Sequence, residues 1–207
     1  NSRLRTITGT GTTADLAGNG TLGYHDDNAP DAEFYGPRGL AVDGSGNVYV
    51  ADLGNNVIRK ITPGGVVSTF AGSGFAGFTN ATGTAASFNN PSSVAVDGSG
   101  NVYVADYGNN AIRKITPAGV VTSLAGFKTG GFLNGTGTAA GFKNPTAVAV
   151  DATGNIYVAD EGNSAIRKIT ADGVVTTIAG GSSQTQLLNF PTGIALDKDG
   201  NIFIVDE

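Results

Sequence analysis

The sequence predicts an all-β fold built from repeated units of four short antiparallel strands, on three observations. A phrase close to AVDGSGNVYVAD, followed by IRKIT, occurs almost four times. Each copy opens with a proline, and each contains short β-branched stretches separated by Gly and Asn turns. Repetition on this scale sets the architecture. The marker prolines, spaced by 54, 54 and 46 residues, are Pro37, Pro91, Pro145 and Pro191.

The first complete copy contains four strand signals. The apolar run 39–43 is followed by a Gly-Ser-Gly-Asn turn, and residues 48–52 are rich in β-branched and aromatic side chains. Residues 57–62 alternate apolar and polar, and 66–71 form the fourth run. No apolar stripe with helical periodicity of useful length is present. Four antiparallel strands in every 50 residues or so are typical of a β-propeller blade.

The motif that runs from Val-Ala-Val-Asp through Gly-Asn-Val-Tyr-Val-Ala-Asp to Ile-Arg-Lys-Ile resembles the NHL repeat. The resemblance covers essentially the whole chain and implies a β-propeller of four-stranded blades. It does not specify an activity, because propellers that resemble this family do many unrelated things.

The four units form a single propeller domain whose last blade is split. The C-terminal half-unit would supply inner strands between 193 and 206, and the N-terminal segment would supply outer strands at 4–8 and 12–17. Because ring closure removes sheet edges, we expect four blades closed by these two half-blades. Completion by pairing with other copies is the alternative. The units are residues 37–90, 91–144 and 145–190, and a split blade of 191–207 plus 1–36.

Composition argues against nucleic acid as a partner and favours a location outside the cell. The net charge of −5 offers no basic face for a phosphate backbone. No apolar run is long enough for membrane insertion. Charged residues make up only 14%, the chain has 33 Gly and no Cys, and this style favours an extracellular or cell-surface protein.

An aspartate recurs where the first strand of each unit meets an Asp-x-x-Gly-Asn turn. We interpret it as a turn residue that accepts backbone hydrogen bonds while Gly supplies positive φ. A cation or polar ligand at one mouth of the channel is the alternative. The residues are Asp43, Asp97, Asp151 and Asp197.

A second recurring aspartate ends the next strand, and an arginine follows on the third strand. We expect a carboxylate–guanidinium pair that fixes the geometry of each blade. The fourth pair would join the two chain ends and would therefore test closure. The pairs are Asp52–Arg59, Asp106–Arg113, Asp160–Arg167 and Asp206–Arg5.

An aromatic residue recurs on the second strand, and we expect it to pack in the core, since both faces of a blade meet neighbours. The single histidine, His25, lies beside Asp26 and Asp27. One histidine with carboxylates makes a poor zinc site, and the spacing is not that of a calcium loop. We therefore expect a solvated loop, no metal and no cofactor, with an oxygen-bound hard cation as the alternative. The aromatic series is Tyr49, Tyr103, Tyr157 and Phe203.

The long inter-blade segments 72–90 and 126–144 are rich in phenylalanine and also carry Asn-x-Thr sequons. Such loops either tuck over a blade or meet a partner. Phe88 and Phe142 recur with Phe34 and look like core anchors. The sequons are compatible with glycosylation, but their number is what chance predicts. Possible contact residues are Phe75, Phe78, Phe127 and Phe132; possible glycosylation sites are Asn19, Asn80 and Asn134.

These observations favour a non-enzymatic structural or protein-interaction module whose partner is a protein, including copies of itself in a filament or tube. The alternative is a lactonase- or lyase-like propeller enzyme with a divalent cation in the central channel, which the family resemblance allows. With no Cys and one His, the chain offers no catalytic triad, and we assign no catalytic residue.

Overall fold

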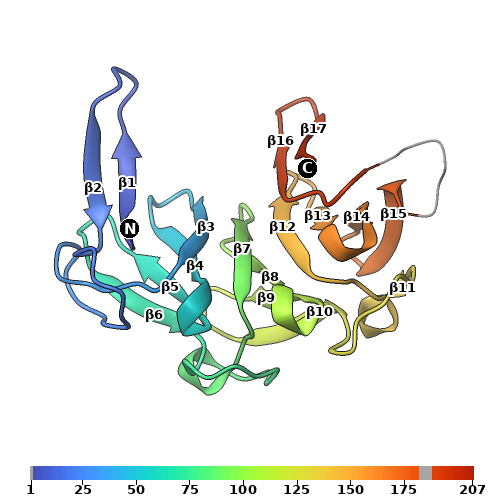
Figure 1. The fold of residues 1–207 in the computed structure, drawn as a ribbon, viewed down its shortest axis with the longest axis horizontal. Coiled ribbons are helices and arrows are strands. Elements are labelled where there is room, and N and C mark those ends of the chain that lie inside the picture. Colours follow the sequence, from blue (N-terminus) through green and yellow to red (C-terminus); the bar gives the residue numbers. More distant parts are fainter. Residues whose placement is uncertain (1, 182–187) are drawn as a thin grey trace.

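The structure, a computed structural model, describes residues 2–181 and 188–207 and is all-β. Three antiparallel sheets, which we call blades 1 to 3, lie between two separate two-stranded hairpins (Figure 1). Two of these sheets have four strands, and the third has four strands and a short fifth one. The expected antiparallel blades are thereby confirmed. Blade 1 contains β3 (Pro37–Val42), β4 (Val48–Asp52), β5 (Val57–Ile61) and β6 (Val67–Ala71). Blade 2 contains β7 (Pro91–Val96), β8 (Val102–Asp106), β9 (Ala111–Ile115) and β10 (Val121–Gly126).

Blade 3 has the same meander with one short extra strand on its outer edge. It contains β12 (Pro145–Val150), β13 (Ile156–Asp160), β14 (Ala165–Ile169) and β15 (Val174–Gly180), with β11 (Gly135–Thr136) beside β15. The N-terminal hairpin consists of β1 (Leu4–Ile7) and β2 (Thr13–Ala17), and the C-terminal hairpin of β16 (Gly193–Leu196) and β17 (Ile202–Val205).

Local turn chemistry explains why each strand ends where it does. In blade 1 the β3–β4 turn places Gly46 at φ +83°, a conformation that glycine adopts without strain. After β4 a one-turn 3₁₀ helix ends in Asn56 at φ +55°, a left-handed position that asparagine tolerates. The 3₁₀ helices are η1 (Leu53–Asn55), η2 (Gly83–Ala85), η3 (Tyr107–Asn109), η4 (Gly137–Ala139) and η5 (Glu161–Asn163).

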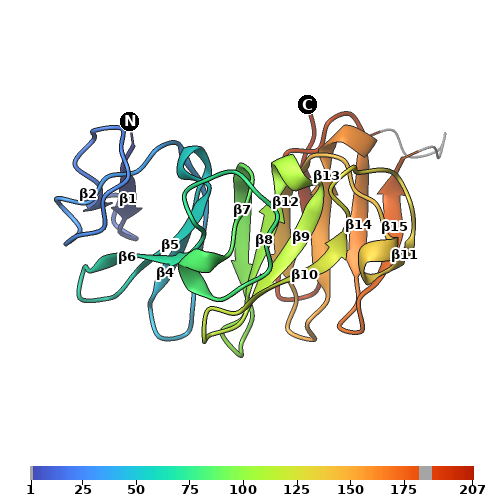
Figure 2. The same ribbon diagram turned by 90° about the horizontal axis from the view of Figure 1, so that it is seen from below.

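Adjacent blades pack face to face, and the core lies between them (Figure 2). Between blades 1 and 2, Tyr49 and Ala51 of β4 share one buried cluster with Val94 of β7. Blades 2 and 3 repeat this arrangement with β8 against β12. The inner strands β3, β7, β12 and β16 lie next to one another in this order. Each blade therefore depends on its neighbours for burial of its apolar faces.

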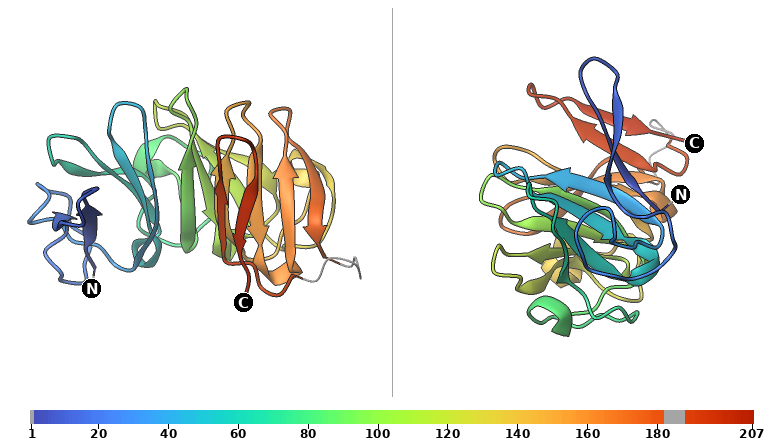
Figure 3. Two further views of the ribbon diagram at one scale, coloured as in Figure 1. Left: turned by 90° about the horizontal axis from the view of Figure 1, so that it is seen from above. Right: turned by 90° about the vertical axis from the view of Figure 1, so that its left-hand side faces the viewer.

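The two terminal hairpins do not assemble into the expected split blade in this structure. They form separate sheets at opposite ends of the arc of blades (Figures 1 and 3). Each is anchored to its own neighbour: Leu4 of β1 clusters with Val50 of blade 1, and Ile204 of β17 packs against Ala159 of blade 3. Because three packed blades separate these anchors, the count of four blades in a closed ring remains a prediction.

No helix within the described residues is both long and apolar enough to cross a membrane.

Candidate functional site

Each complete blade encloses one arginine that is fully buried together with an aspartate. An ion pair of this kind needs good geometry and further hydrogen bonds, because both charges lose their water. The Nη1 atom of each arginine donates to Oδ2 of its aspartate. The pairs are Asp52–Arg59 at 3.0 Å, Asp106–Arg113 at 2.8 Å and Asp160–Arg167 at 2.9 Å.

Each guanidinium lies between two aromatic rings and also donates to backbone carbonyls. In blade 1 the Cζ atom of Arg59 is 4.8 Å from the ring centre of Phe34 and 5.4 Å from that of Tyr24. Its Nη1 donates to the carbonyl of Glu33 and its Nη2 to that of His25, both at 2.8 Å. The rings are Phe78 and Phe88 around Arg113, and Phe132 and Phe142 around Arg167. Cation–π contact and hydrogen bonding together fix the planar guanidinium.

The carboxylates are held as firmly as the arginines. Asp106 Oδ1 accepts the backbone N–H of Asn89 at 2.8 Å, and Oδ2 accepts the side-chain amide of Asn109 at 2.9 Å. Burial raises the pKa of Asp106, against the opposing effect of these hydrogen bonds and of Arg113, whose own pKa burial lowers. Burial likewise raises the pKa of Asp52 and Asp160. Buried pairs with occupied oxygens hold the blade together and face no substrate.

The fourth expected pair is not formed, since the structure does not bring Arg5 and Asp206 together. Arg5 Nε instead donates to Asp15 Oδ1 at 2.9 Å within the N-terminal hairpin. Asp206 Oδ1 accepts the backbone N–H of Asn189 at 2.8 Å. In this structure the two hairpins form separate sheets, and the Asp206–Arg5 pair remains a prediction.

The turn aspartates have their oxygens occupied from within the turn. Asp43 Oδ1 accepts the N–H groups of Ser45 and Asn47, and Oδ2 accepts the amide of Asn47 at 2.8 Å and the hydroxyl of Tyr49 at 3.3 Å. Burial alone would raise the pKa of Asp43, but these hydrogen bonds outweigh it and lower the pKa. The same directions hold for Asp97 and Asp151. Such saturated carboxylates offer little to a cation.

The aromatic series on the second strand splits into two environments. Tyr49 and Tyr103 are buried and Tyr157 is partly buried, whereas Phe203 of β17 is exposed. The difference follows from position, because no blade among the described residues covers the face of β17 that carries Phe203.

The four phenylalanines expected to contact a partner differ in their surroundings. Phe75 is 81% exposed. Phe78 and Phe132 instead stack on the buried guanidiniums, so their place in the blade accounts for them. Phe127 is half-buried. The sequence analysis interpreted Phe78 and Phe132 as possible contact residues and missed that Tyr24, Phe78 and Phe132 recur at intervals of 54 residues.

The same spacing links Asp26 to two of the sequon asparagines. Asn80 Oδ1 accepts Nη2 of Arg113 at 2.8 Å, and Asn134 Oδ1 accepts Nη2 of Arg167 at 3.0 Å. Both asparagines are exposed. Asn19 differs, because its Oδ1 accepts the N–H of Thr21. Glycosylation at these three residues remains a prediction.

The loop of His25 is exposed, and the Nδ1 atom of His25 lies 3.9 Å from Asp27 Oδ2. Over residues 2–181 and 188–207, no group of three or more His, Cys, Asp or Glu side chains is arranged to hold a metal ion.

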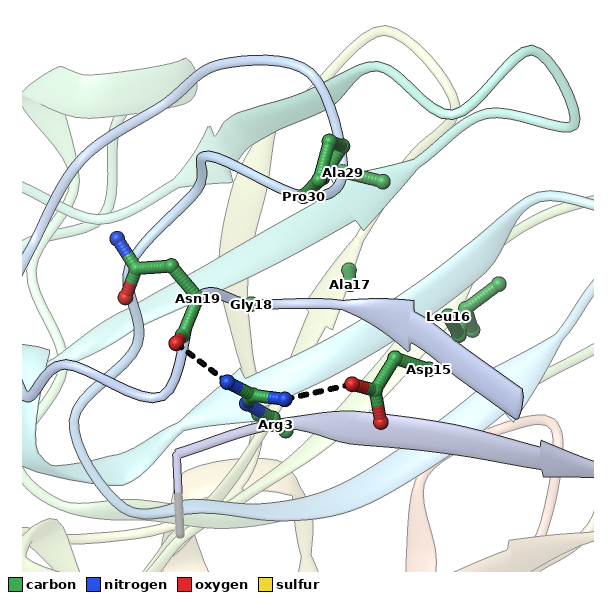
Figure 4. A pocket seen from close by; sticks show the side chains of 8 residues that line it. All are labelled: Arg3, Asp15, Leu16, Ala17, Gly18, Asn19, Ala29 and Pro30. Atoms are coloured by element: carbon green, nitrogen blue, oxygen red, sulfur yellow. Dashed lines mark hydrogen bonds and ion pairs between the residues drawn. The ribbon is translucent and has the colours of Figure 1, made fainter. Parts of the chain in front are cut away.

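A hollow of about 320 Å³ lies on the N-terminal hairpin (Figure 4). Arg3 crosses it, donating through Nη1 to Asp15 Oδ2 at 2.6 Å and through Nη2 to the carbonyl of Asn19 at 2.7 Å. Because these charges pair with each other at the surface, the hollow presents no free functional group of its own.

Three exposed apolar residues lie in the segments that flank the outer strand β6 of blade 1. The ring of Tyr24 lies against Gly74, the residue before Phe75, and Leu22 precedes Tyr24 by two residues. Leu22, Tyr24 and Phe75 are all exposed. We call these three residues the rim patch.

Comparison with known proteins explains the repeated cluster. The family described as NHL repeat matches residues 34–61, 88–115 and 142–169, each of which runs from an aromatic ring of the cluster past its ion pair. Mouse (Mus musculus) Teneurin-3 is 27% identical over 181 residues, which is 78% of this chain and 6% of that protein. The protein SUPPRESSOR OF QUENCHING 1, chloroplastic, of Arabidopsis thaliana is 35% identical over 80 residues, 38% of this chain and 8% of that protein.

Solved structures share the β-propeller fold. A Bacteroides thetaiotaomicron protein of unknown function matches 99% of this chain and 54% of its own, with a TM-score of 0.71 and 20% identity. The nidogen/laminin complex matches 82% and 56%, with a TM-score of 0.62 and 22% identity. A gluconolactonase from Xanthomonas campestris matches 82% and 54%, with a TM-score of 0.60 and 16% identity. The chain thus spans less than a tenth of these curated relatives and about half of these structures.

Proposed function

We propose that this chain, which belongs to the NHL-repeat β-propellers, is a non-enzymatic structural and protein-interaction module. In this proposal it lies outside the cell or on the cell surface, and it assembles with copies of itself. The carrying observation is a contrast. The recurring charged residues of each complete blade are used internally. Phe75 of the rim patch, by contrast, is 81% exposed and lies outside the clusters around the buried arginines.

A protein partner suits this surface better than a small molecule does. Exposed aromatic side chains on a rigid scaffold are the usual anchors of protein interfaces. The backbone around the patch is fixed, because the hydroxyl of Tyr24 hydrogen-bonds to Thr69 and its ring covers Arg59. The low charge and the Gly-rich composition support a location outside the cell, and the likeness to the nidogen/laminin complex supports an interaction role by analogy.

The enzymatic alternative is a lactonase- or lyase-like propeller with a divalent cation in the channel. It is supported by fold likeness to a gluconolactonase and to a streptogramin B lyase, each 16% identical to this chain. Within the described residues, no group of three or more His, Cys, Asp or Glu side chains is arranged to hold such a cation.

The test compares proteins retained from the source's secreted and surface fractions by three immobilised chains: wild type, Phe75→Ser, and Val120→Ser as an exposed control away from the rim patch. The proposal expects one set of proteins to bind wild type and Val120→Ser and to be lost with Phe75→Ser. Identical retention by all three chains would contradict it. Fractionation of the source organism tests the location separately.

A further inference from the structure

Two apolar faces, one at each end of the arc, are exposed where their repeat equivalents are buried. Phe203 and Val205 of β17 are each 59% exposed, whereas Tyr49, which corresponds to Phe203, is 4% exposed. Leu40 of β3 is 54% exposed, whereas Val94, its equivalent 54 residues later, is 4% exposed. Both faces are therefore built like blade-to-blade contacts, and no blade among the described residues covers them.

The molecule itself shows what covers such faces. Inside the arc, β4 packs on β7, so that Tyr49 and Ala51 bury Val94. By the repeat, β17 corresponds to β4, and β3 corresponds to β7. The exposed face of β17 is therefore the natural cover for the exposed face of β3.

The backbone edges match in the same way. In blade 1, β4 pairs with β5, with Tyr49 opposite Lys60 and Val50 opposite Arg59. In the described part of the chain, β17 pairs only with β16, and β1 only with β2. The same register would place Phe203 opposite Thr6 and Ile204 opposite Arg5. Both edges offer the unpaired N–H and C=O groups that attract another strand.

One ion-pair site is present as two halves. Asp206 Oδ1 accepts the N–H of Asn189 at 2.8 Å, just as Asp52 Oδ1 accepts that of Tyr35 at 2.8 Å. Oδ2 of Asp52 accepts a hydrogen bond from Nη1 of Arg59, but no arginine of the described residues donates to Asp206. Arg5, the repeat equivalent of Arg59, has a side chain that is 53% exposed, against 0% for Arg59.

The surface is also hollowed beside β1 and β3 and beside β17, where these strands would meet. A hollow of about 180 Å³ beside β1 and β3 is lined by Leu4, Arg5, Leu40 and Val50 among others. A second, of about 330 Å³, covers the C-terminal hairpin beside Phe203.

A second copy fits these faces better than the other end of the same chain. Three packed blades hold the two hairpins at opposite ends of the arc (Figure 1). Nearly the whole chain superposes on only about half of a related propeller. The curvature of the arc is therefore that of a ring with more blades than this chain supplies. Two unlike faces on one molecule make a head-to-tail contact between copies.

We propose that the C-terminal hairpin of one copy completes the N-terminal hairpin of a second copy, giving a four-stranded blade shared by two chains. The inference names one partner within the function proposed above. It uses faces other than the rim patch, and Phe75→Ser should therefore leave this assembly intact even if the rim patch binds its own partner.

The experiment uses the absence of native cysteine. Lys60 Nζ lies 5.7 Å from the ring centre of Tyr49, so the equivalents Thr6 and Phe203 should face each other across the joint. Opposed residues of an antiparallel pair are close enough for a disulfide. Separately purified Thr6→Cys and Phe203→Cys chains are mixed and oxidised, and both positions are exposed, so that folding is not at risk.

The proposal expects a disulfide between the two different chains, which can form only between copies, and a wild-type mass in solution of at least two chains. Leu40→Asp should reduce that mass to one chain, whereas Phe75→Ser should not. A disulfide confined to single chains of the doubly substituted protein would show closure within one chain and would overturn the proposal. Absence of any cross-link, or a wild-type mass of one chain, would also overturn it.

Discussion

Arg59 donates through both Nε and Nη2 to a single oxygen of Asp26, at 3.0 and 2.6 Å. Blade 2 has Asn80 at the equivalent position, and Asn80 Oδ1 accepts a hydrogen bond from Nη2 of Arg113 but none from its Nε. The Nε atoms of Arg113 and Arg167 are consequently buried without a hydrogen-bond partner. A buried donor without a partner carries the cost of its lost water.

Replacing Asn80 with Asp should therefore stabilise the protein. The new carboxylate can accept from Nε and Nη2 of Arg113, and its second oxygen can accept the N–H of Ser123, as Asp26 accepts that of Thr69 at 2.8 Å. We expect the free energy of unfolding to rise by about 1 kcal/mol. The reverse change, Asp26→Asn, should lower it by a similar amount. Urea denaturation of both variants checks this, and a loss of stability in Asn80→Asp would contradict it.

Removing the charge of Asp106 should destabilise the protein strongly. Asp106→Asn keeps the shape of the side chain but leaves the buried Arg113 without its counter-charge. Breaking one side of a buried ion pair costs about 3–5 kcal/mol. Asp199→Asn, at an exposed position, is the matched control and should change little. The double variant Asp106→Asn/Arg113→Met should recover part of the loss in thermal denaturation, and no recovery would show that the charge is not the cause.

Substitutions of the inter-blade phenylalanines Phe78 and Phe75 should have different effects on the free energy of unfolding. Phe78→Leu removes the ring that lies 4.6 Å from Cζ of Arg113 and should lower the free energy of unfolding by about 1–3 kcal/mol. Phe75→Ser, at a highly exposed position, should stay within about 0.5 kcal/mol of wild type. Equal losses in both variants, measured by chemical denaturation, would contradict the assignment of Phe75 to the surface.

The repeat made much of this site predictable. The recurrence of Asp52 and Arg59 in each unit pointed to an ion pair, and the β-branched runs and Gly turns marked the strands. The partners of Arg59 on the other side, Tyr24 and Asp26, were missed because they lie in a loop whose first copy differs in residue type from the later ones. A comparison by position would have found them.

The arrangement of the terminal hairpins could not be predicted from the sequence, for a different reason. Repeat arithmetic shows that Arg5 and Asp206 belong to complementary halves of one unit. The angle between successive blades, however, is set by how side chains such as Tyr49 and Val94 interlock. That angle decides whether a half meets its own chain or another copy, and no local pattern encodes it.

The turn aspartates should give the protein a characteristic loss of stability in acid. Burial opposes ionisation of Asp97, but the hydrogen bonds from Asn101, Tyr103 and Ser99 prevail and hold its pKa below the usual 3.8. A carboxyl whose pKa is lower in the folded state stabilises the protein above its unfolded pKa, and this contribution disappears as the pH falls through the folded pKa. Burial and the hydrogen bond that Tyr103 donates to Asp97 raise the pKa of Tyr103 to about 12.

Asp97→Asn should therefore be less stable than wild type at pH 7, by about 1–3 kcal/mol for a lost charged hydrogen-bond acceptor. The difference should shrink steadily below pH 3.8, since wild type then loses the same charge. Urea denaturation at several pH values checks this. Tyr103→Phe serves as the matched control, because it removes one hydrogen bond to Asp97 but leaves the carboxylate, and its pH dependence should persist. A difference between Asp97→Asn and wild type that stayed constant in acid would show that the carboxylate charge does not stabilise the turn.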